Sequence, residues 1–171
     1  LAREGSVDAV CFTPLNKQAL RMAGNRHEDE LRFAAEALEW SELVSEFNIL
    51  GPLWNARVTS HIPLSQVAAS LSVERIAESI ELTNRMMRQA GFERPRIAVA
   101  GLNPHAGDRG AFGNDEIEVI GPAVAAARKQ GIEALGPYPA DTVYIGARDG
   151  KFDAVVSMYH DQGQIAMKLL G

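Results

Sequence analysis

Short apolar runs alternate along the chain with longer stretches in which apolar residues recur every three or four positions. The short runs are typical of strands that are buried on both faces, and the longer stretches are typical of helices with one buried face. Six runs predict strands, at residues 8–12, 46–50, 54–60, 96–100, 132–135 and 152–158. Five stretches predict helices, at residues 15–23, 27–38, 73–90, 114–131 and 141–147, and another helix begins near residue 159.

The stretch at residues 73–90 gives the clearest helix signal. Ser72 stands at the N-cap, where its hydroxyl can accept a hydrogen bond from a first-turn amide, and Gly91 suits the position just after the helix. By contrast, Pro122 lies inside the stretch 114–131, where a proline removes a backbone hydrogen bond. We therefore expect a regular helix at residues 73–90 and a kinked one at residues 114–131.

The alternation of strands and helices predicts an α/β fold of three layers, α/β/α, with a largely parallel sheet between the helices. Residues 23–28 are the best candidate for a crossing between two lobes. Residues 1–24 would then end a first lobe, and residues 25–171 would form most of a second, metal-binding lobe. The chain has no initial Met and stops inside an apolar, helix-like segment, so we expect it to be a piece of a longer protein.

The composition excludes several classes of protein. With 171 residues, 46% of them apolar and 23% charged, the chain can bury a core and is neither disordered nor collagen-like. The net charge is −5 and no basic stripe is visible, so we expect no nucleic-acid partner. No apolar run approaches the ~20 residues of a membrane span, so we expect no membrane partner. Cys11 has no second cysteine to pair with, which favours a reduced, cytoplasmic location.

Three of the four histidines, His61, His105 and His160, each follow the end of a different predicted strand. In open α/β sheets, ligands bind at the carboxyl ends of the strands. If these three strands are neighbours, the three imidazoles meet at one site. Three neutral imidazoles suit a divalent transition metal and leave coordination positions open for substrate or water.

Each of these histidines also has an ordinary explanation. A single histidine at a strand end is more often hydrogen-bonded within the structure, or an acid–base group, than a metal ligand. The spacings of 44 and 55 residues form no short metal motif such as HExxH. From the residues alone, a joint metal site and three separate roles therefore both stay open.

Four charged residues are further candidates. Asp141 and Asp161 could reach the same edge of the sheet, either to fix an imidazole or to accept a proton. Lys17 and Lys168 could hold a phosphate or a carboxylate, although lysines at such positions are usually solvated surface residues. The loop at residues 101–110 is rich in glycine, which allows the backbone to approach a ligand. No GxGxxG sequence and no phosphate-binding P-loop sequence is present, so no nucleotide site can be derived from motifs.

Five segments are similar to the motifs of one known family. In chain order they are Thr13-Pro-Leu-Asn-Lys, Thr59-Ser-His-Ile-Pro-Leu, Gly101-Leu-Asn-Pro-His-Ala-Gly, Gly136-Pro-Tyr-Pro-Ala-Asp-Thr and Met158-Tyr-His-Asp-Gln-Gly. They resemble motifs of the 4-hydroxythreonine-4-phosphate dehydrogenases of pyridoxal phosphate biosynthesis. The resemblance extends over essentially the whole chain.

The resemblance implies a metal-dependent oxidation of a secondary alcohol by NAD or NADP, followed by decarboxylation, on a fold similar to that of isocitrate and isopropylmalate dehydrogenases. It implies that a divalent cation (zinc, magnesium or cobalt) binds at a site shared between the two subunits of a homodimer. The implied metal ligands are His61, His105 and His160. The implied substrate-binding residues are His27, Lys17 and Lys168, and the candidate catalytic proton acceptors near the metal are Asp141 and Asp161. The cofactor-binding residues stay unassigned, because much of the family's cofactor-binding sequence follows the position of Gly171.

One motif departs from the biosynthetic members of this family. Where they have Gly-His-Thr-Glu, this chain has Asn25-Arg26-His27-Glu28-Asp29-Glu30. A carboxylate replaces a hydroxyl donor beside His27 and would repel a substrate anion. This form is more similar to the branch that oxidises carboxylated cis-dihydrodiols, such as the terephthalate dihydrodiol, in aromatic catabolism. A dihydrodiol dehydrogenase is therefore the alternative function. A metal-assisted hydrolase or lyase without nicotinamide and a non-catalytic small-molecule-binding protein are two further hypotheses.

Overall fold

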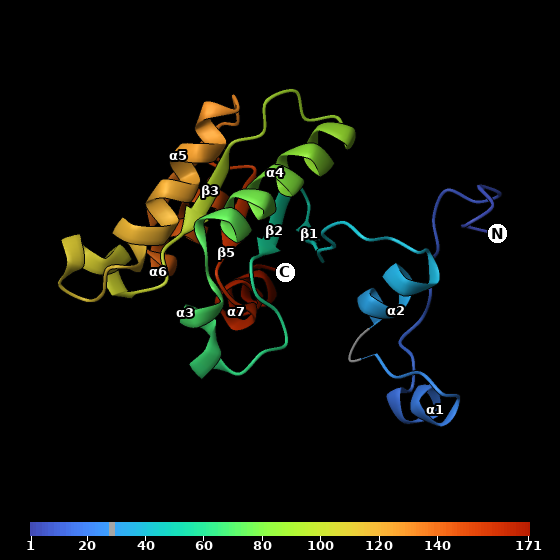
Figure 1. Ribbon diagram of the computed structural model, residues 1–171. Coiled ribbons are helices and arrows are strands. Elements are labelled where there is room, and N and C mark those ends of the chain that lie inside the picture. The colour runs from blue at the N-terminus through green and yellow to red at the C-terminus, as the bar shows by residue number, and fades with distance from the viewer. Residues whose placement is uncertain (28–29) are drawn as a thin grey trace. The chain divides into compact units, whose positions relative to one another are not determined.

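The computed structural model describes residues 1–27 and 30–171 (Figure 1). Contacts between residues divide the chain into two compact units, Leu1–Val44 and Ser45–Gly171. The lobe boundary that we predict near residue 24 lies inside the first of these units. A compact unit of this chain and a lobe of the complete protein are different things, so the lobe boundary stays a prediction.

The first unit contains two short helices, α1 (Lys17–Met22) and α2 (Glu30–Ala37). Asn16 caps α1, because its side-chain oxygen accepts a hydrogen bond from the Ala19 amide at 3.0 Å. The second helix is shorter than its predicted span of 27–38, of which residues 28 and 29 lie outside the described part of the chain. Neither helix has a fully buried residue, and the apolar residues of α2 are at most half-buried.

The predicted strand at residues 8–12 is wrong. These residues have no strand structure, and Val10 and Phe12 are 69% and 60% exposed. Cys11, which we expected to be buried in this strand, is exposed as well. A strand needs a neighbour for its backbone hydrogen bonds, and the described residues of this unit contain no second strand. An apolar run therefore does not by itself produce a strand here.

The second unit is built around a sheet of five strands in the order β1-β2-β5-β3-β4. The strands are β1 (Asn48–Leu50), β2 (Leu53–Arg57), β3 (Ile97–Ala100), β4 (Ala134–Tyr138) and β5 (Ala154–Ser157). Strands β2, β5, β3 and β4 are parallel to one another. The short edge strand β1 is antiparallel to β2. Val155 pairs with Asn55 on one side and with Ala98 on the other, so β5 is the central strand. The largely parallel sheet is thereby confirmed.

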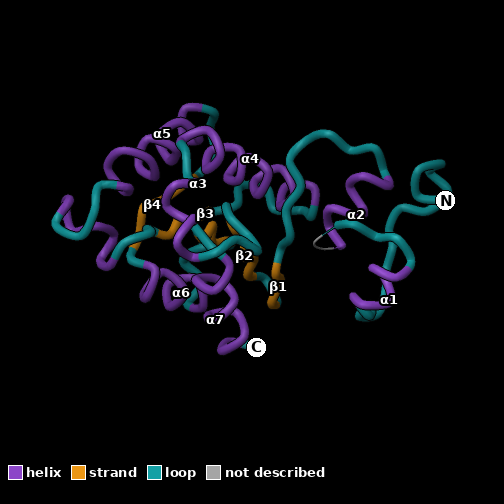
Figure 2. The backbone as a smooth tube through the Cα atoms, turned by 60° about the horizontal axis from the view of Figure 1, so that its bottom comes forward, coloured by secondary structure: helices purple, strands orange, loops and turns teal. Residues whose placement is uncertain are grey.

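Helices cover both faces of this sheet, as Figure 2 shows, with α4 and α5 on one side of the strands and α6 and α7 on the other. The helices are α3 (Val67–Ser70), α4 (Val73–Gln89), α5 (Gly121–Lys129), α6 (Ala140–Arg148) and α7 (His160–Leu170). Successive residues of the central strand point to opposite faces: Val156 packs with Ile80 of α4, and Val155 packs in the cluster that includes Tyr144 of α6. The three-layer α/β/α arrangement is confirmed. None of the described helices is long and apolar enough to cross a membrane.

The helix predicted at residues 73–90 is confirmed almost to the residue. Ser72 caps α4 by accepting a hydrogen bond from the Arg75 amide at 3.1 Å, and Gly91 after its end has a φ of 100°. The stretch predicted as one kinked helix at 114–131 is a π-helical turn, Glu116–Ile120, that continues without a break into α5, so the predicted irregular helix is present. Pro122 lies two residues after this turn, inside the continuous helix, and the Gly121 amide just before it bonds to the Glu116 carbonyl five positions earlier.

Arg96 and Asp153 join the starts of β3 and β5, at the edge of the sheet opposite to the strand ends that precede the histidines. The Asp153 carboxylate accepts hydrogen bonds from Nη2 and Nε of Arg96 at 2.7 and 3.0 Å and from the Arg96 amide at 2.8 Å. The hydrogen bonds from the Arg96 side chain are the main reason why the pKa of Asp153 lies below its ordinary value.

We expect Asp153→Asn to lower the free energy of unfolding of the complete protein by about 1–2 kcal/mol near neutral pH. The unfolded chain binds a proton at Asp153 more tightly than the folded protein does. The carboxylate therefore stabilises the fold above its unfolded pKa, and this contribution is lost as the pH falls through the folded pKa. Urea unfolding measured at a series of pH values should show the two proteins converging in acid.

Asp149→Asn is the matched control for this measurement. Asp149 forms an ion pair with the adjacent Arg148 at 2.9 Å, and both side chains are about half exposed. Such surface pairs contribute little to stability, so this variant should follow the wild type at every pH. A stability difference for Asp153→Asn that stays constant into acid would contradict the proposed electrostatic origin.

Candidate functional site

The order of the sheet places the three strands that precede the candidate metal ligands next to one another. β5 lies between β2 and β3, and all three are parallel. His160 is the first residue of α7, after β5, and His61 and His105 lie in the connections that follow β2 and β3. The three histidines therefore follow the carboxyl ends of three neighbouring strands, which is the condition that the sequence argument required.

His61 and His160 line a common pocket of about 230 Å³, formed by residues 59–62, 64, 67 and 159–161. The centres of the two rings are 5.6 Å apart, and their planes are inclined by 39°. This separation is compatible with two imidazoles that each place one nitrogen ~2 Å from the same ion. The structure therefore brings together two of the three histidines that the sequence groups.

Thr59 holds the two connections of this pocket together. Its amide and its hydroxyl both donate to the Met158 carbonyl, at 3.1 and 2.8 Å, and its side chain is fully buried. These bonds continue the pairing of β2 with β5 up to the residues next to His61 and His160. Sequence analysis assigned no role to Thr59, although this residue begins one of the five family-like segments, because threonine is common in strands.

Asp161 contacts the imidazole of His160 directly. The distance between Asp161 Oδ1 and His160 Nδ1 is 2.7 Å. When Nδ1 donates its proton to this carboxylate, the lone pair of the imidazole is on Nε2. A carboxylate in this position is the usual means of orienting a metal-binding histidine. Of the two roles considered for Asp161, the geometry favours fixing the imidazole.

His105 lies outside this pocket, in the 3-10 turn Pro104–Gly110. Residues 105–109 all have a positive φ, between 39° and 77°. Such a left-handed turn costs about 1–2 kcal/mol for each residue other than glycine, and strain of this kind is concentrated at functional sites. The His105 ring is exposed, and its centre lies 6.0 Å from that of Phe112. Among the described residues, no three His, Cys, Asp or Glu side chains are close enough to hold a metal ion, so the three-histidine site stays a prediction.

The remaining candidates of the second unit differ in their positions. Asp141 is exposed in the first turn of α6, which follows β4 at the same edge of the sheet as the histidines. Lys168 is exposed in the last turn of α7, roughly 12 Å along the helix from His160. Neither lines the pocket of His61 and His160. Their proposed roles are therefore not supported by contacts within this pocket.

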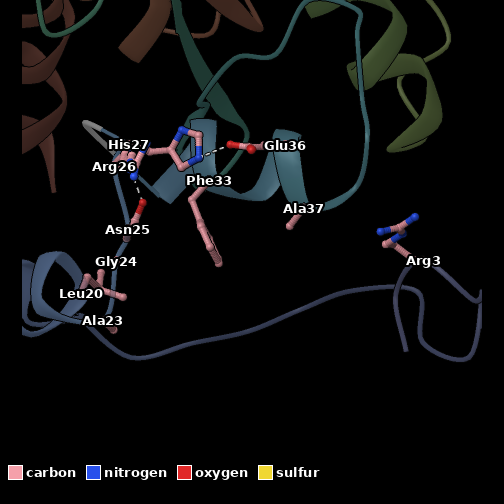
Figure 3. A pocket seen from close by; sticks show the side chains of 10 residues that line it. All are labelled: Arg3, Leu20, Ala23, Gly24, Asn25, Arg26, His27, Phe33, Glu36 and Ala37. Carbon is pink, nitrogen blue, oxygen red and sulfur yellow. Dashed lines mark hydrogen bonds and ion pairs between the residues drawn. The ribbon is translucent and has the colours of Figure 1, made fainter.

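The first unit has a pocket of its own, of about 780 Å³, lined by Arg3 and by residues 20, 23–27, 33, 36 and 37 (Figure 3). Nε2 of His27 forms an ion pair with the Glu36 carboxylate, and the His27 amide donates to Asn25 Oδ1 at 2.9 Å. The Phe33 ring meets His27 edge-on, with 6.2 Å between the ring centres. His27 is thus held in place at a half-buried position, whereas Lys17 is exposed and does not line this pocket.

Two more polar residues contact the loop that contains His105, and sequence reasoning did not assign either of them to a site. Gln162 follows His160 and Asp161 on α7, and Glu116 begins the π-helical turn. Gln162 belongs to one of the five family-like segments, which is the signal that could have identified it. Glu116 instead looks like an ordinary acidic residue in the first turn of a helix, where the helix dipole favours it.

Comparison with known proteins gives a single family. The family model described as pyridoxal phosphate biosynthetic protein PdxA matches residues 1–171. A protein of Rhizobium meliloti, whose name marks it as an unverified 4-hydroxythreonine-4-phosphate dehydrogenase 2, is 56% identical over all of this chain and 49% of its own length. The D-threonate 4-phosphate dehydrogenase of Pectobacterium atrosepticum is 42% identical over all of this chain and 52% of its own length.

Solved structures agree with this result. A 4-hydroxythreonine-4-phosphate dehydrogenase from Klebsiella pneumoniae has a TM-score of 0.91 and 44% identity over 99% of this chain and 51% of its own. A terephthalate 1,2-cis-dihydrodiol dehydrogenase from Burkholderia xenovorans has a TM-score of 0.80 and 31% identity over 98% of this chain and 53% of its own. The chain spans about half the length of the curated relatives that it matches. Because the family model matches every residue, and the resemblance of the five segments is thereby confirmed, this chain belongs to the family of PdxA, the pyridoxal phosphate biosynthetic protein.

Proposed function

We propose that the complete protein is a dehydrogenase that oxidises a secondary alcohol of a phosphorylated four-carbon acid, with NAD or NADP as the hydride acceptor. The pairing of His61 with His160, at the carboxyl ends of neighbouring strands in a chain that matches this family throughout, is the observation that supports it most. The residues that bind the nicotinamide cofactor stay unassigned.

The identities favour a phosphorylated substrate over a dihydrodiol. Relatives named for 4-hydroxythreonine 4-phosphate and D-threonate 4-phosphate are 56% and 42% identical, and the terephthalate dihydrodiol dehydrogenase is 31% identical. Both phosphorylated acids have a hydroxyl on the carbon β to the carboxylate. Its oxidation produces a β-keto acid, which can lose carbon dioxide. The residue that suggested the dihydrodiol alternative, Glu28, lies outside the described residues.

The donor chemistry of the pocket fits a divalent transition metal held by His61 and His160, with His105 as the third ligand. Such an ion, when bound, would polarise the substrate oxygen. Asp161 would keep His160 in the tautomer that presents Nε2, because it already contacts Nδ1. That contact makes Asp141 the better candidate to accept the proton of the substrate hydroxyl, since its carboxylate is exposed at the same edge of the sheet.

We place His105 in a site that two subunits of a homodimer share. His105 is exposed, and the same part of the chain exposes two apolar side chains, Phe112 at 52% and Ile117 at 56%. Apolar side chains that are exposed close together are typical of protein–protein contacts. A second copy that covers this loop would bury both and could receive His105 beside its own His61 and His160.

The anionic ends of the substrate are assigned to the cationic candidates. We keep His27, Lys17 and Lys168 as candidates that bind the anionic groups of the substrate, each within its own unit, because all three are exposed or half-buried. The ion pair between His27 and Glu36 would have to break when an anion binds to His27.

A substrate panel on the complete protein tests this function. With a divalent metal and NAD or NADP, we expect absorbance at about 340 nm to rise with 4-hydroxythreonine 4-phosphate or D-threonate 4-phosphate. The unphosphorylated alcohols should react at least about a hundredfold more slowly, since the substrate phosphate supplies binding energy. A chelator should stop the reaction, and added zinc, magnesium or cobalt should restart it.

The other outcomes of this panel separate the alternatives. Oxidation of a carboxylated cis-dihydrodiol, but of neither phosphorylated acid, would support the dihydrodiol dehydrogenase. Turnover of a substrate without nicotinamide would support a metal-assisted hydrolase or lyase. Tight binding of a phosphorylated acid without any turnover, when metal and both cofactors are supplied, would support a non-catalytic binding protein.

A further inference from the structure

We propose that Gln162 and Glu116 are positioning residues that fix the loop of residues 101–113, and with it His105, relative to the helix that contains His160 and Asp161. This inference rests on the proposed metal site. It adds two side chains that hold the loop of the proposed ligand His105 in place and that contact neither metal nor substrate.

Gln162 bridges the ends of two adjacent strands. Its Oε1 accepts a hydrogen bond from the Met158 amide at 2.7 Å, and its Nε2 donates to the Gly101 carbonyl at 2.8 Å. Met158 immediately follows β5, and Gly101 immediately follows β3. One acceptor and one donor are needed at once, so an amide fits this position and a carboxylate does not.

Glu116 holds the next two residues of the same loop. It is only 4% exposed, and its Oε1 accepts hydrogen bonds from the amides of Leu102 and Asn103, both at 2.7 Å. Its Oε2 accepts a third bond from Nδ2 of Asn103 at 3.0 Å. Burying a carboxylate is costly unless it is hydrogen-bonded, and these three donors offset that cost. Side chains from two different elements therefore hold Gly101, Leu102 and Asn103 in succession.

The far side of the loop packs against the same carboxylate. A Cβ added to Gly107, where φ is 77°, would lie 2.6 Å from Oε2 of Glu116, and one added to Gly101 would lie 3.1 Å from Oε1. Glycines at both positions thus let the backbone close around Glu116. His105 lies between these two glycines in the sequence, so both ends of its segment are in contact with one buried group.

These contacts explain how a strained loop can keep a defined position. The left-handed residues 105–109 would relax to ordinary backbone conformations unless surrounding contacts hold them. Gln162 ties this loop to the first turn of α7, in which His160 is the first residue and Gln162 is the third. The distance between His105 and the other proposed ligands therefore depends on Gln162 and Glu116, although neither is itself a ligand.

The test uses Gln162→Glu in the complete protein, with Gln164→Glu on the same helix as the matched control for the added charge. The carboxylate of Gln162→Glu keeps an acceptor for Met158 but cannot donate to the Gly101 carbonyl. We expect its Zn²⁺ affinity to fall about tenfold to a hundredfold, with a thermal midpoint close to that of the wild type. Saturating Zn²⁺ should restore most of kcat, which a general folding defect would not allow.

Amide hydrogen exchange of residues 101–113, measured without metal, gives the second readout. We expect exchange at least about tenfold faster in Gln162→Glu and in Glu116→Gln, and no change in Gln164→Glu. Unchanged exchange in both variants would overturn the proposal, and so would faster exchange with wild-type Zn²⁺ affinity. If the wild type itself binds no Zn²⁺, the proposed metal site fails, while the exchange measurement still decides whether the two side chains hold the loop.

Discussion

Replacement of His160 by alanine in the complete protein should abolish metal binding and turnover together. The His160 ring lies 5.6 Å from that of His61, and its Nδ1 is already bonded to Asp161. The substitution removes one proposed metal ligand, and Asp161 then has no imidazole to orient. We expect Zn²⁺ affinity to fall by at least about a hundredfold, because loss of an orienting partner alone costs tenfold to a hundredfold. Titration calorimetry and nicotinamide absorbance measure the two effects.

Two variants serve as controls for this experiment. His27→Ala makes the same substitution in the other compact unit, and it should keep the metal stoichiometry while raising KM for the phosphorylated substrate. Asp161→Asn keeps the His160 ring but weakens its acceptor, so its metal affinity should lie between those of the wild type and His160→Ala. A His160→Ala protein that turns over at the wild-type rate would remove the metal site from the mechanism.

Gly163→Ala should destabilise the protein, although alanine ordinarily stabilises a helix by about 1 kcal/mol relative to glycine. The added Cβ would lie 2.5, 2.7 and 2.9 Å from Nδ2, Oδ1 and Cγ of Asn55. Asn55 is fully buried, and its Oδ1 accepts a hydrogen bond from the Tyr144 hydroxyl at 2.6 Å, so its side chain has little room to move. We expect the free energy of unfolding to fall by about 1–3 kcal/mol, measured by urea unfolding. The displaced helix should also lower kcat, because His160 and Asp161 lie in its first turn.

Comparison variants isolate the clash as the cause. In an Asn55→Ala background, the obstacle is gone and Gly163→Ala should become neutral or stabilising, which a double-mutant cycle reports as coupling between the two positions. Gly146→Ala on α6 places its Cβ 3.0 Å from the edge of the Phe152 ring, and this half-buried ring can move by the few tenths of an ångström required. Its effect should therefore be smaller. A more stable Gly163→Ala protein would show that α7 tolerates the shift.

Much of the fold follows from the sequence because buried parallel strands are apolar runs and their helices have regular stripes. β3, β5 and α4 are where the pattern predicts them. The exceptions depend on neighbours that a local pattern does not contain. The segment 8–12 finds no strand to pair with among the described residues of its unit. β4 extends through Pro137, beyond the predicted end of this strand at residue 135, because an edge strand tolerates a residue without an amide hydrogen.

The placement of the three histidines at strand ends was predictable from the sequence, whereas the side chains that hold their loops in place were not. Histidines at strand ends have a topological meaning, and the sheet order confirms that their strands are neighbours. Glu116 could not be recognised in this way, because its burial results from bonds to backbone amides 13 and 14 positions earlier. The sequence likewise did not predict that His105 lies outside the pocket, because this position depends on the left-handed backbone conformation of its loop.

The strand at the centre of this sheet comes after its four partner strands in the sequence. β5 enters between β2 and β3, and the Ser157 hydroxyl bonds to the Ala56 carbonyl across 101 positions of chain. During synthesis, β2 and β3 therefore leave the ribosome well before the strand that must separate them. Contacts this distant form slowly, and unpaired strand edges readily associate with other chains. We therefore expect these five strands to assemble late during synthesis, and chaperones that shield strand edges to matter most before Ala154 emerges.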